Sequence, residues 1–332
     1  MAESPQNDAD SKDLEPQSSQ KAATKVRFLT VDADSADRRL DNLLLSELKG
    51  VPRSKIYKII RSGEVRVNKG RCKPATRLNE GDVVRIPPVR TAEAAPKPDG
   101  SSAAWINKYI IHKDADVIAV NKPAGLAVHG GSGVSAGLIE LLRAANPAEK
   151  SLELVHRLDR DTSGCLLVAR KRSSLRYLHE AFREGNVKKT YLAVLEGPLS
   201  SGTQDVKLPL ETRNRQNGER HVVVSDNGKK AHTRFVPLSP YRLATYTKVD
   251  LFTGRTHQIR AHAQAIGHPV LGDSRYGTED SEADRKLKVK RLCLHAAVLE
   301  YPDRHGEGTV MIEAPLDEQM SAVVNRLDKI GN

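Results

Sequence analysis

The amino-acid sequence predicts two folded parts, a small basic module that combines helices with strands and a larger domain, and three observations support this division. Lys and Arg are concentrated between residues 38 and 90, where fourteen of them stand against five acidic residues. Within that window the apolar residues change from helical spacing to alternation. A segment rich in Pro, Ala, Gly and Ser follows, which predicts a linker over 91–104 and a second domain over 105–332.

The small module, residues 38–90, is predicted to be α+β. Leucines at positions 40, 43, 44 and 48 share one face of a first helix, and Pro52 begins a second helix that Gly63 ends. Residues 64–68 alternate between polar and apolar, residues 68–70 form a turn, and residues 81–86 form a further short strand. The expected product is two helices followed by a small hairpin-like sheet.

The second helix of the module is strongly basic. Its cations are Arg53, Lys55, Lys58 and Arg61. Positive charges on a rigid helix neutralise phosphates and give salt-sensitive binding with little sequence preference. The formal net charge of +11 for the whole chain also favours a polyanionic partner, usually nucleic acid. A solvated basic helix face is the alternative, and the clustering of the charges argues against it.

Composition excludes several classes of protein. No apolar run approaches the roughly 18 residues that cross a bilayer, so we expect no membrane partner. Residues 1–25 are polar and acidic, which predicts a disordered tail and no secretory signal. Cys72, Cys165 and Cys293 lie far apart, which argues against a disulfide framework and against a paired-cysteine metal site. The cytoplasm is therefore the expected location.

Charged residues crowd between two apolar strands at 152–170. His156, Arg157, Asp159, Arg160 and Asp161 all lie within this short loop. Because burying an unpaired carboxylate is costly, a partner must be held close to it. The spacing alone leaves two interpretations open, a functional site and a structural turn of paired Asp and Arg.

A second polar cluster lies at 251–277. Arg255, His257, Arg260, His262 and His268 crowd together in it, and no HExxH motif, cysteine or carboxylate ligand lies among them, so the cluster does not predict a metal site. We interpret its histidines as hydrogen-bonded structural or RNA-facing groups. Interleaved apolar residues indicate a half-buried helix, on which Arg260 needs an anion.

Two further segments have weaker patterns. Residues 186–197 predict a strand, in which Tyr191 alone would be read as a core residue. Residues 133–137 match the GxSxG pattern of serine hydrolases, just after an HGG run at 129–131. A nucleophile elbow needs a strand that runs directly into the serine, whereas the run into Ser135 is rich in glycine. A loop over a cleft is the preferred interpretation, and fluorophosphonate labelling of Ser135 distinguishes the two.

Several motifs occur in a fixed order and together carry a family resemblance. NKPAGLAVH at 121–129, HRLDRDTSG at 156–164, KKTYLAVLEG at 188–197 and GRTHQIRAH at 254–262 resemble the pseudouridine synthases of the RluA family. RRLDNLLLSEL, PRSKIYKIIRSGEVRVNKGR and LNEGDVVRIP resemble the S4 RNA-binding domain. The resemblance covers about residues 38–320. LCLHAAVLEY and IEAPLDE are similar to the branch of the family that modifies 23S RNA of the large ribosomal subunit.

The resemblance implies an α+β fold overall, in which a mixed, mainly antiparallel sheet with flanking helices follows a small α+β S4-like module. It implies an isomerase that converts uridine in RNA to pseudouridine without a cofactor or a metal. Asp159 corresponds to the essential carboxylate, which acts either as a nucleophile or by abstracting a sugar proton. Arg260 corresponds to the cation that pairs with Asp159 and orients it. Tyr191 corresponds to the residue that stacks on the uracil.

The resemblance also implies residues that handle the RNA. Arg157 corresponds to the side chain that fills the gap left by an everted uridine, with a structural ion pair as its alternative role. Ile259 is expected to form the wall opposite Tyr191. We expect a monomer that acts on ribosomal RNA of the large subunit. The rival interpretations are a non-catalytic RNA-binding or ribosome-assembly factor on the same fold, and a family member with other target uridines.

Overall fold

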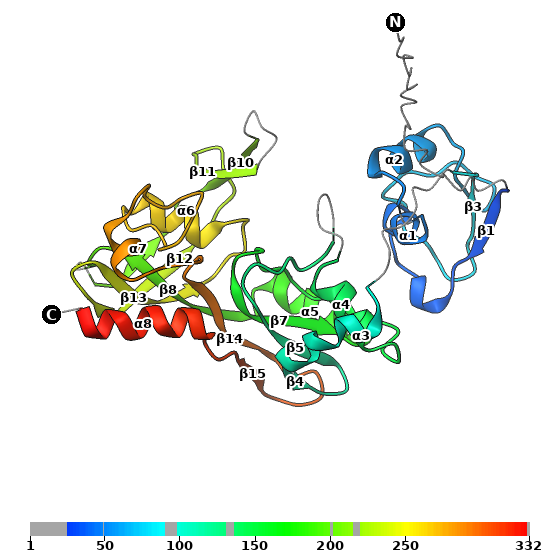
Figure 1. The fold of residues 1–332 in the computed structure, drawn as a ribbon. Helices are drawn as coiled ribbons and strands as arrows, with labels where there is room; N and C mark the ends of the chain where they lie inside the picture. The colour runs from blue at the N-terminus through cyan, green and yellow to red at the C-terminus, as the bar shows by residue number, and fades with distance from the viewer. Residues whose placement is uncertain are drawn as a thin grey trace, which may run out of the picture. The chain divides into compact units, whose positions relative to one another are not determined.

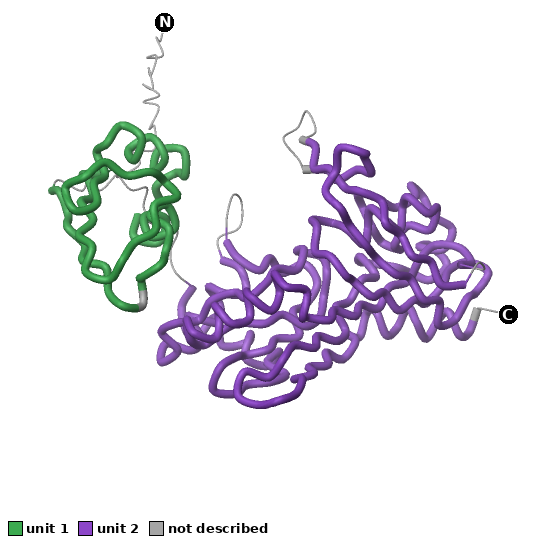
Figure 2. Tube along the Cα trace, turned by 180° about the vertical axis from the view of Figure 1, so that it is seen from behind, with its two compact units in different colours: residues 1–96 green, residues 97–332 purple. Residues whose placement is uncertain are grey.

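The structure is a computed structural model of the 332-residue chain, and it describes residues 25–48, 50–89, 98–130, 136–199, 202–214 and 220–330. The chain divides into two compact units, Met1–Pro96 and Lys97–Asn332 (Figures 1 and 2). The expected tail lies outside the described residues up to residue 24, as do residues 91–97 of the expected linker and Ser135 of the hydrolase-like motif.

The N-terminal unit combines two helices with a three-stranded antiparallel sheet (Figure 1). Helix α1 spans Leu40–Glu47 and α2 spans Arg53–Arg61, which confirms both predicted helices. The sheet has the order β1-β3-β2, with β1 at Arg27–Thr30, β2 at Arg66–Val67 and β3 at Val83–Ile86. Strand β1 was not predicted, because its four residues are mostly exposed and show no clear apolar alternation.

A buried carboxylate ties the two helices of this unit together. Asp41 in α1 is only 1% exposed, and it accepts two hydrogen bonds from Arg39 and one from the hydroxyl of Tyr57 in α2. The hydrogen bond from Arg39 lowers the pKa of Asp41 despite its burial. The isoleucines of α2 point into the core, so its basic side chains are left on the outer face. The core isoleucines of α2 are Ile56, Ile59 and Ile60.

The end of the segment expected to be linker is helical. Helix α3 spans Gly100–Ala103 and continues into a 3₁₀ helix at Ala104–Tyr109. The side chain of Asp99 accepts hydrogen bonds from the backbone N–H groups of Ser101 and Ser102, which caps the first turn. Ala103 and Ile106 are fully buried. The small polar residues of 98–104 concealed this helix, because they carry almost no apolar period.

A ten-stranded sheet forms the frame of the large unit. Its main path runs β4-β5-β7-β14-β8-β13-β12-β9, while β15 pairs with β14 and β6 pairs with β7. The pairs are antiparallel except β7–β14, which confirms a mixed, mainly antiparallel sheet. The strands are β4 (Ile110–Lys113), β5 (Val117–Lys122), β6 (Glu153–Leu154), β7 (Ser163–Ala169), β8 (Lys188–Glu196), β9 (Gln204–Val206), β12 (Thr233–Pro240), β13 (Ala244–Leu251), β14 (Leu294–Pro302) and β15 (Thr309–Glu313).

Helices cover this sheet, and a separate hairpin stands beside it (Figure 1). The hairpin consists of β10 (Leu210–Asn214) and β11 (Arg220–Val224). The helices are α4 (Leu138–Ala145), α5 (Arg172–Glu184), α6 (Gln258–Ala265), α7 (Glu282–Lys286) and α8 (Glu318–Ile330). None of the helices in the described segments is both long and apolar enough to cross a membrane.

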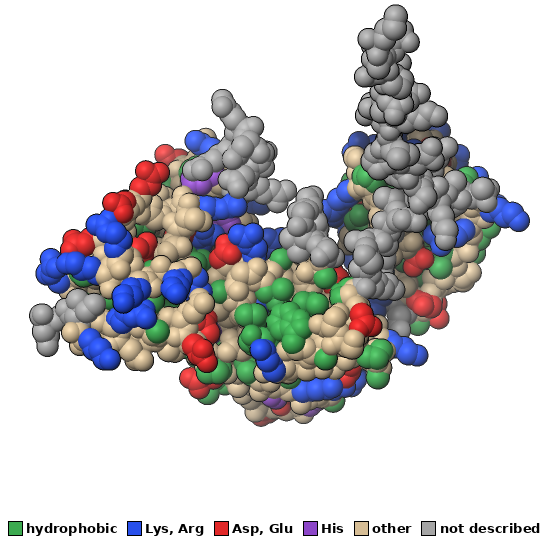
Figure 3. Space-filling view, viewed as in Figure 1, with side chains coloured by type: hydrophobic (Ala, Val, Ile, Leu, Met, Phe, Trp, Pro, Cys, Tyr) green, Lys and Arg blue, Asp and Glu red, His purple; other side chains and the backbone are tan. Residues whose placement is uncertain are grey.

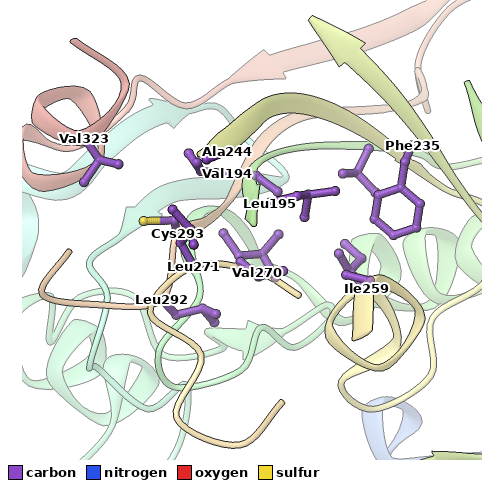
Figure 4. Packing of buried hydrophobic residues seen from close by; sticks show 14 of the residues in the cluster. Val194, Leu195, Phe235, Ala244, Ile259, Val270, Leu271, Leu292, Cys293 and Val323 are labelled. Carbon is purple, nitrogen blue, oxygen red and sulfur yellow. The ribbon is translucent and has the colours of Figure 1, made fainter. Parts of the chain in front are cut away.

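Strand β7 is buried throughout and mostly apolar, because helices cover both of its faces. Alternate residues point to opposite sides, so Leu167 packs in the same cluster as Leu178 of α5, while Leu166 packs in the same cluster as Leu142 of α4. In the other half of the sheet, Leu195 of β8 shares a core with Ile259 of α6 (Figure 4). These two cores fix the strand ends and the α6 helix that carry the polar cluster described below.

The two halves of the sheet meet at the parallel contact between β7 and β14. Ser163 pairs with His295 and Gly164 pairs with Ala296. A Cβ atom on Gly164 would lie 2.2 Å from the carbonyl oxygen of Ala296, and its φ of +110° is one that side-chain-bearing residues rarely adopt. Glycine is therefore required here, where the charged loop 156–162 enters the sheet.

Candidate active site

A cavity of about 320 Å³ opens beside the start of β7. Its walls come from four parts of the chain: the loop before β7, strand β8 with the nearby α5, the segment that leads from β13 into α6, and the first residue of β14. The lining residues are His156, Arg157, Leu158, Asp159, Thr162, Phe182, Lys189, Tyr191, Leu251, Gly254, Arg255, Thr256, His257, Gln258, Ile259, Arg260 and Leu294. All five residues that the sequence predicted for the catalytic domain are brought together here.

The loop that carries Asp159 is anchored from outside its own segment. Lys122, at the end of β5, is fully buried, and its ammonium donates to the carbonyl oxygens of Pro123, Leu126 and Arg160 at 2.8–2.9 Å. The backbone N–H of Gly125 donates to the same Arg160 carbonyl at 2.9 Å. Burial lowers the pKa of Lys122 to about 7. The three N–H groups of the ammonium each have an acceptor, which offsets part of the cost of burying the charge.

Arg260 is held by an acidic partner that the sequence analysis did not identify. Its Nε and Nη2 donate to the two carboxylate oxygens of Asp273, each at 2.6 Å. Burial would raise the pKa of Asp273, but the hydrogen bonds and charge of Arg260 outweigh it and lower that pKa. Asp273 is fixed in turn by the backbone N–H groups of Arg275 and Tyr276. The guanidinium is therefore immobilised, and Nη1 is its one nitrogen that does not bind Asp273.

That remaining nitrogen faces Asp159. Nη1 of Arg260 lies 3.7 Å from Oδ2 of Asp159, and Nε2 of His257 lies 3.8 Å from the same oxygen. The side chain of Asp159 is 27% exposed, so it faces the cavity while Arg260 is buried behind it. The expected pairing of Arg260 with Asp159 is present as an ion pair, but the tightest contacts of Arg260 are to Asp273.

Tyr191 lies near the middle of β8, an inner strand of the sheet between β13 and β14. It pairs with Val249 of β13 on one side and Ala296 of β14 on the other. Its ring packs against the apolar clusters of both halves while also lining the cavity. Burial, with a further contribution from Asp159, raises the pKa of Tyr191. The cavity therefore has a flat, uncharged aromatic wall.

Arg157 and Ile259 line the same cavity in different ways. Arg157 is exposed, and within the described part of the chain its guanidinium makes no ion pair and no hydrogen bond. The alternative role of Arg157, as part of a structural ion pair, therefore has no support. Ile259 is only 4% exposed and belongs mainly to the core around Leu195 and Phe235 (Figure 4).

His156 supports the loop from its other end. The backbone N–H of Leu167 donates to Nε2 of His156 at 3.1 Å, and the imidazole stacks on Phe182 with ring centroids 5.1 Å apart. Burial, reinforced by the charge of Lys189, lowers the pKa of His156 to about 4. The ring is therefore neutral at neutral pH and accepts a hydrogen bond from the backbone of β7.

The cavity lining is basic apart from Asp159. The other charged residues in it are Arg157, Lys189, Arg255 and Arg260, and Asp159 is the one carboxylate among the lining residues. Lys and Arg side chains gather at the hollow in the visible face of the large unit (Figure 3). A single carboxylate amid cations suits a polyanion that must place one group beside an acid.

The predicted RNA-binding residues of the N-terminal unit belong to a separate surface. Arg53, Lys55, Lys58 and Arg61 are all exposed on α2, and among the described residues none of them forms an ion pair. Arg61 lies over the ring of Tyr57 at 5.9 Å. Four cations without acidic partners make an open, positively charged helix face.

Three residues that shape the site were missed by the sequence analysis. Asp273 and Tyr276 lie in GDSRYG, where an acid and an aromatic residue between two glycines were a weak signal of a built turn. Lys122 ends an apolar strand, which is a rare place for a lysine. Among the residues with assigned positions, no three His, Cys, Asp or Glu side chains are grouped so that they could hold a metal ion.

The chain is similar to known proteins along most of its length. Residues 116–265 match the family model of RNA pseudouridylate synthase, and residues 38–84 match that of the S4 domain. The chain is 50% identical over 311 residues to ribosomal large subunit pseudouridine synthase C of Escherichia coli strain K12, covering 91% of this chain and 97% of that protein. It is 48% identical to the protein of the same name from Pasteurella multocida, covering 91% and 94%.

Solved structures show a similar fold. Human RNA pseudouridylate synthase domain containing 4 aligns with a TM-score of 0.58 and 24% identity, covering 69% of this chain and 96% of that one. Human RNA pseudouridylate synthase domain containing 1 aligns with a TM-score of 0.54 and 27% identity, covering 67% and 93%.

Proposed function

The chain belongs to the RNA pseudouridylate synthase family, and from this premise we propose that it isomerises specific uridines in ribosomal RNA of the large subunit, with Asp159 as the essential carboxylate. The observation that carries the proposal is a single carboxylate, in a basic cavity, beside a guanidinium that a second carboxylate immobilises.

The reaction is an intramolecular rearrangement. The C1′–N1 bond of uridine breaks, the uracil turns, and a C1′–C5 bond forms, while the proton lost from C5 is balanced by one gained at N1. The substrate and the product have the same atoms and oxidation state. The carboxylate of Asp159 can act as a nucleophile or take a proton from the sugar, and its position at the cavity wall suits either route.

Arg260 and Tyr191 have complementary roles in this proposal. Because Nε and Nη2 of Arg260 are bound to Asp273, its Nη1 presents a fixed positive charge to Asp159, and Arg260 itself need not move during the reaction. The ring of Tyr191 offers a flat surface on which a uracil can turn without leaving the cavity. Ile259 contributes a small part of the opposite wall.

Arg157 is proposed to replace the everted uridine in the RNA stack. A uridine within folded RNA must leave its helix to reach Asp159, and unstacking costs a few kcal/mol. Arg157 lies two residues before Asp159, is exposed and has no acidic partner among the described residues, so its planar guanidinium is available for the vacated position.

The open basic face of α2 is proposed to bind phosphates of the same RNA. Its four exposed cations provide affinity with little base preference, so the target uridine is selected by the RNA fold around the cavity. The carboxylate, its cation and the aromatic wall of the site are complete within one chain, and we propose a monomer as the active form. Three free cysteines and a ribosomal substrate support a cytoplasmic location.

Pseudouridine mapping in cells tests this proposal. In a strain without its own copy of the gene, carbodiimide treatment and primer extension locate the pseudouridines that are lost from large-subunit RNA. The wild-type chain is expected to restore them, whereas Asp159→Asn is expected to restore none while still binding the RNA. Full restoration by Asp159→Asn would refute the role of the carboxylate. If the wild-type chain restored no pseudouridine but did restore assembly of the large subunit, the rival role in ribosome assembly would be favoured.

A further inference from the structure

His257 contacts the proposed catalytic carboxylate, and nothing in the proposed function uses it. It lies at the N-terminus of α6, where its φ of +50° places a residue other than glycine in the left-handed region. That conformation is unfavourable for a side-chain-bearing residue and persists only where the surroundings enforce it. Here it directs the imidazole into the cavity, with Nε2 3.8 Å from Oδ2 of Asp159.

The other nitrogen of the ring is bound to a buried tyrosine. Nδ1 of His257 lies 2.9 Å from the hydroxyl of Tyr276, which is only 1% exposed. The same hydroxyl oxygen accepts the backbone N–H of Val222, in β11, at 3.0 Å. The ring of Tyr276 is held between His221, stacked at 4.8 Å, and the guanidinium of Arg260, at 5.0 Å. The position of the hydroxyl is therefore set from several sides.

The hydrogen-bond donors and acceptors around Tyr276 and His257 indicate where the protons of these two side chains lie. The Tyr276 oxygen already accepts a hydrogen bond from Val222, and burial raises the pKa of Tyr276, so the phenol keeps its proton. Among the described residues, the acceptor within reach of that proton is Nδ1 of His257. A neutral imidazole that accepts at Nδ1 carries its own proton at Nε2. That Nε2–H is the group nearest to Asp159 on this side.

We propose that His257 is a positioning residue whose Nε2 proton, fixed in place by the hydroxyl of Tyr276, is presented to the carboxylate of Asp159 as a neutral hydrogen-bond donor. The proposal rests on the proposed function of Asp159. Asp159 then has two different neighbours: the permanently charged guanidinium of Arg260 and the uncharged N–H donor of His257. At 3.8 Å the contact is longer than a hydrogen bond, and we infer that it closes when substrate fills the cavity.

The charges around His257 agree with a neutral ring. The ionisable groups that act on it are Asp159, Asp273, Arg260 and Arg275. Burial is the largest influence and lowers the pKa of His257, and the two arginines add to it, while the two carboxylates oppose it. A protonated ring would lose the hydrogen bond from Tyr276, because Nδ1 would then be a second donor.

A spectroscopic experiment tests the proton assignment without relying on activity. In full-length protein labelled with ¹⁵N-histidine, long-range ¹H–¹⁵N spectra distinguish the two neutral tautomers and the cation, and the His257→Gln variant identifies the signals. The proposal expects the Nε2–H tautomer at pH 7.5, and Tyr276→Phe is expected to shift the Nδ1 signal. An Nδ1–H tautomer or a cation at that pH would overturn it.

Single-turnover kinetics test the effect on Asp159. Tyr276→Phe is expected to lower the rate constant for pseudouridine formation about three- to tenfold, and His257→Ala about tenfold or more, with RNA affinity unchanged. His257→Gln, which keeps a donor, is expected to recover part of the loss. Tyr177→Phe removes a hydroxyl that donates to backbone oxygens outside the cavity, and it is the matched control.

The double variant distinguishes a relay from simple structural support. If Tyr276 acts through His257, Tyr276→Phe has no further effect in the His257→Ala background. Additive losses, or equal losses in His257→Ala and His257→Gln, would overturn the proposal. Activity that survives Asp159→Asn would instead refute the proposed function, and it would leave the spectroscopic result intact.

Discussion

The basic face of α2 and the cavity of the large unit both use cations, but they hold them in opposite ways. Arg53, Lys55, Lys58 and Arg61 are exposed, and in the described segments they have no acidic partners. Arg260 is 5% exposed at its side chain and is clamped by a fully buried carboxylate. Under the proposed function, affinity for RNA relies on open charges that can adapt, whereas the reacting group relies on one charge that cannot move.

Removing the carboxylate of Asp273, which holds Arg260 in place, is expected to have the largest effect on stability and activity. Asp273→Asn leaves a buried guanidinium without its carboxylate, which we expect to destabilise the large unit by about 3–5 kcal/mol. Urea unfolding followed by the fluorescence of Trp105, the one tryptophan of the sequence, measures this unit. Variants that remain folded are expected to lose pseudouridine formation, since Arg260 no longer has a fixed position.

A matched control for Asp273 is an exposed carboxylate with similar partners. Asp205 pairs with Arg234 at 3.0 Å and with His232 at 2.7 Å, but these groups are partly exposed. Asp205→Asn is expected to change the free energy of unfolding by at most about 1 kcal/mol. Equal destabilisation by the two variants would show that the burial of the Asp273–Arg260 ion pair does not increase its contribution to stability.

Acid is expected to weaken the cavity wall through His156. The unfolded imidazole takes up a proton near pH 6.5, whereas the folded one does so only near pH 4. The unfolded state therefore binds more protons between these values, and this stability is complete above pH 6.5 and lost as the pH falls towards 4. We expect a loss of up to about 3 kcal/mol, seen as a falling urea midpoint of Trp105 fluorescence. His156→Gln should show a shallower dependence on pH.

Neutralising the α2 face is expected to change binding and leave the fold intact. Replacing Arg53, Lys55, Lys58 and Arg61 by Gln should weaken RNA binding at moderate salt by about 10- to 100-fold and make its salt dependence shallower. The free energy of unfolding should change by about 1 kcal/mol or less, because these exposed side chains form no ion pair with any described residue. Lys286→Gln, in a solvent-exposed pair with Glu282, is the control and should leave binding unchanged. An unaltered salt dependence in the fourfold variant would contradict the proposed role of α2.

The sequence was most informative where its patterns are local. The helices over 38–63 and the apolar strand over residues 165–170 follow from spacing alone, and α1, α2 and β7 are observed there, with β7 starting two residues earlier at Ser163. The mixed sheet and the grouping of Asp159, Tyr191 and Arg260 were implied by family resemblance, because pairing between distant strands leaves no local signal. Strand β1 and the helix at 100–103 were missed for the lack of an apolar period.

The partners of the site were harder to predict than its members. Arg260 was expected to need an anion, but two candidates, Asp159 and Asp273, lie 101 and 13 residues away in sequence. Which one forms the tight pair depends on the turn at 273–277, whose backbone N–H groups hold Asp273 in place. Likewise, the contact of His257 with Tyr276 depends on how the β10–β11 hairpin and α6 pack together.

Two aspartates in one loop provide the most direct test of the central claim. Asp159 lines the cavity beside Arg260, whereas Asp161, two residues later, is paired with the exposed Arg160 at 3.0 Å and does not line it. The measurement is the single-turnover rate of pseudouridine formation on ribosomal RNA by purified Asp159→Asn and Asp161→Asn. We expect no detectable product from Asp159→Asn and a rate within about threefold of wild type from Asp161→Asn. Comparable rates from the two variants, or a greater loss in Asp161→Asn, would contradict it.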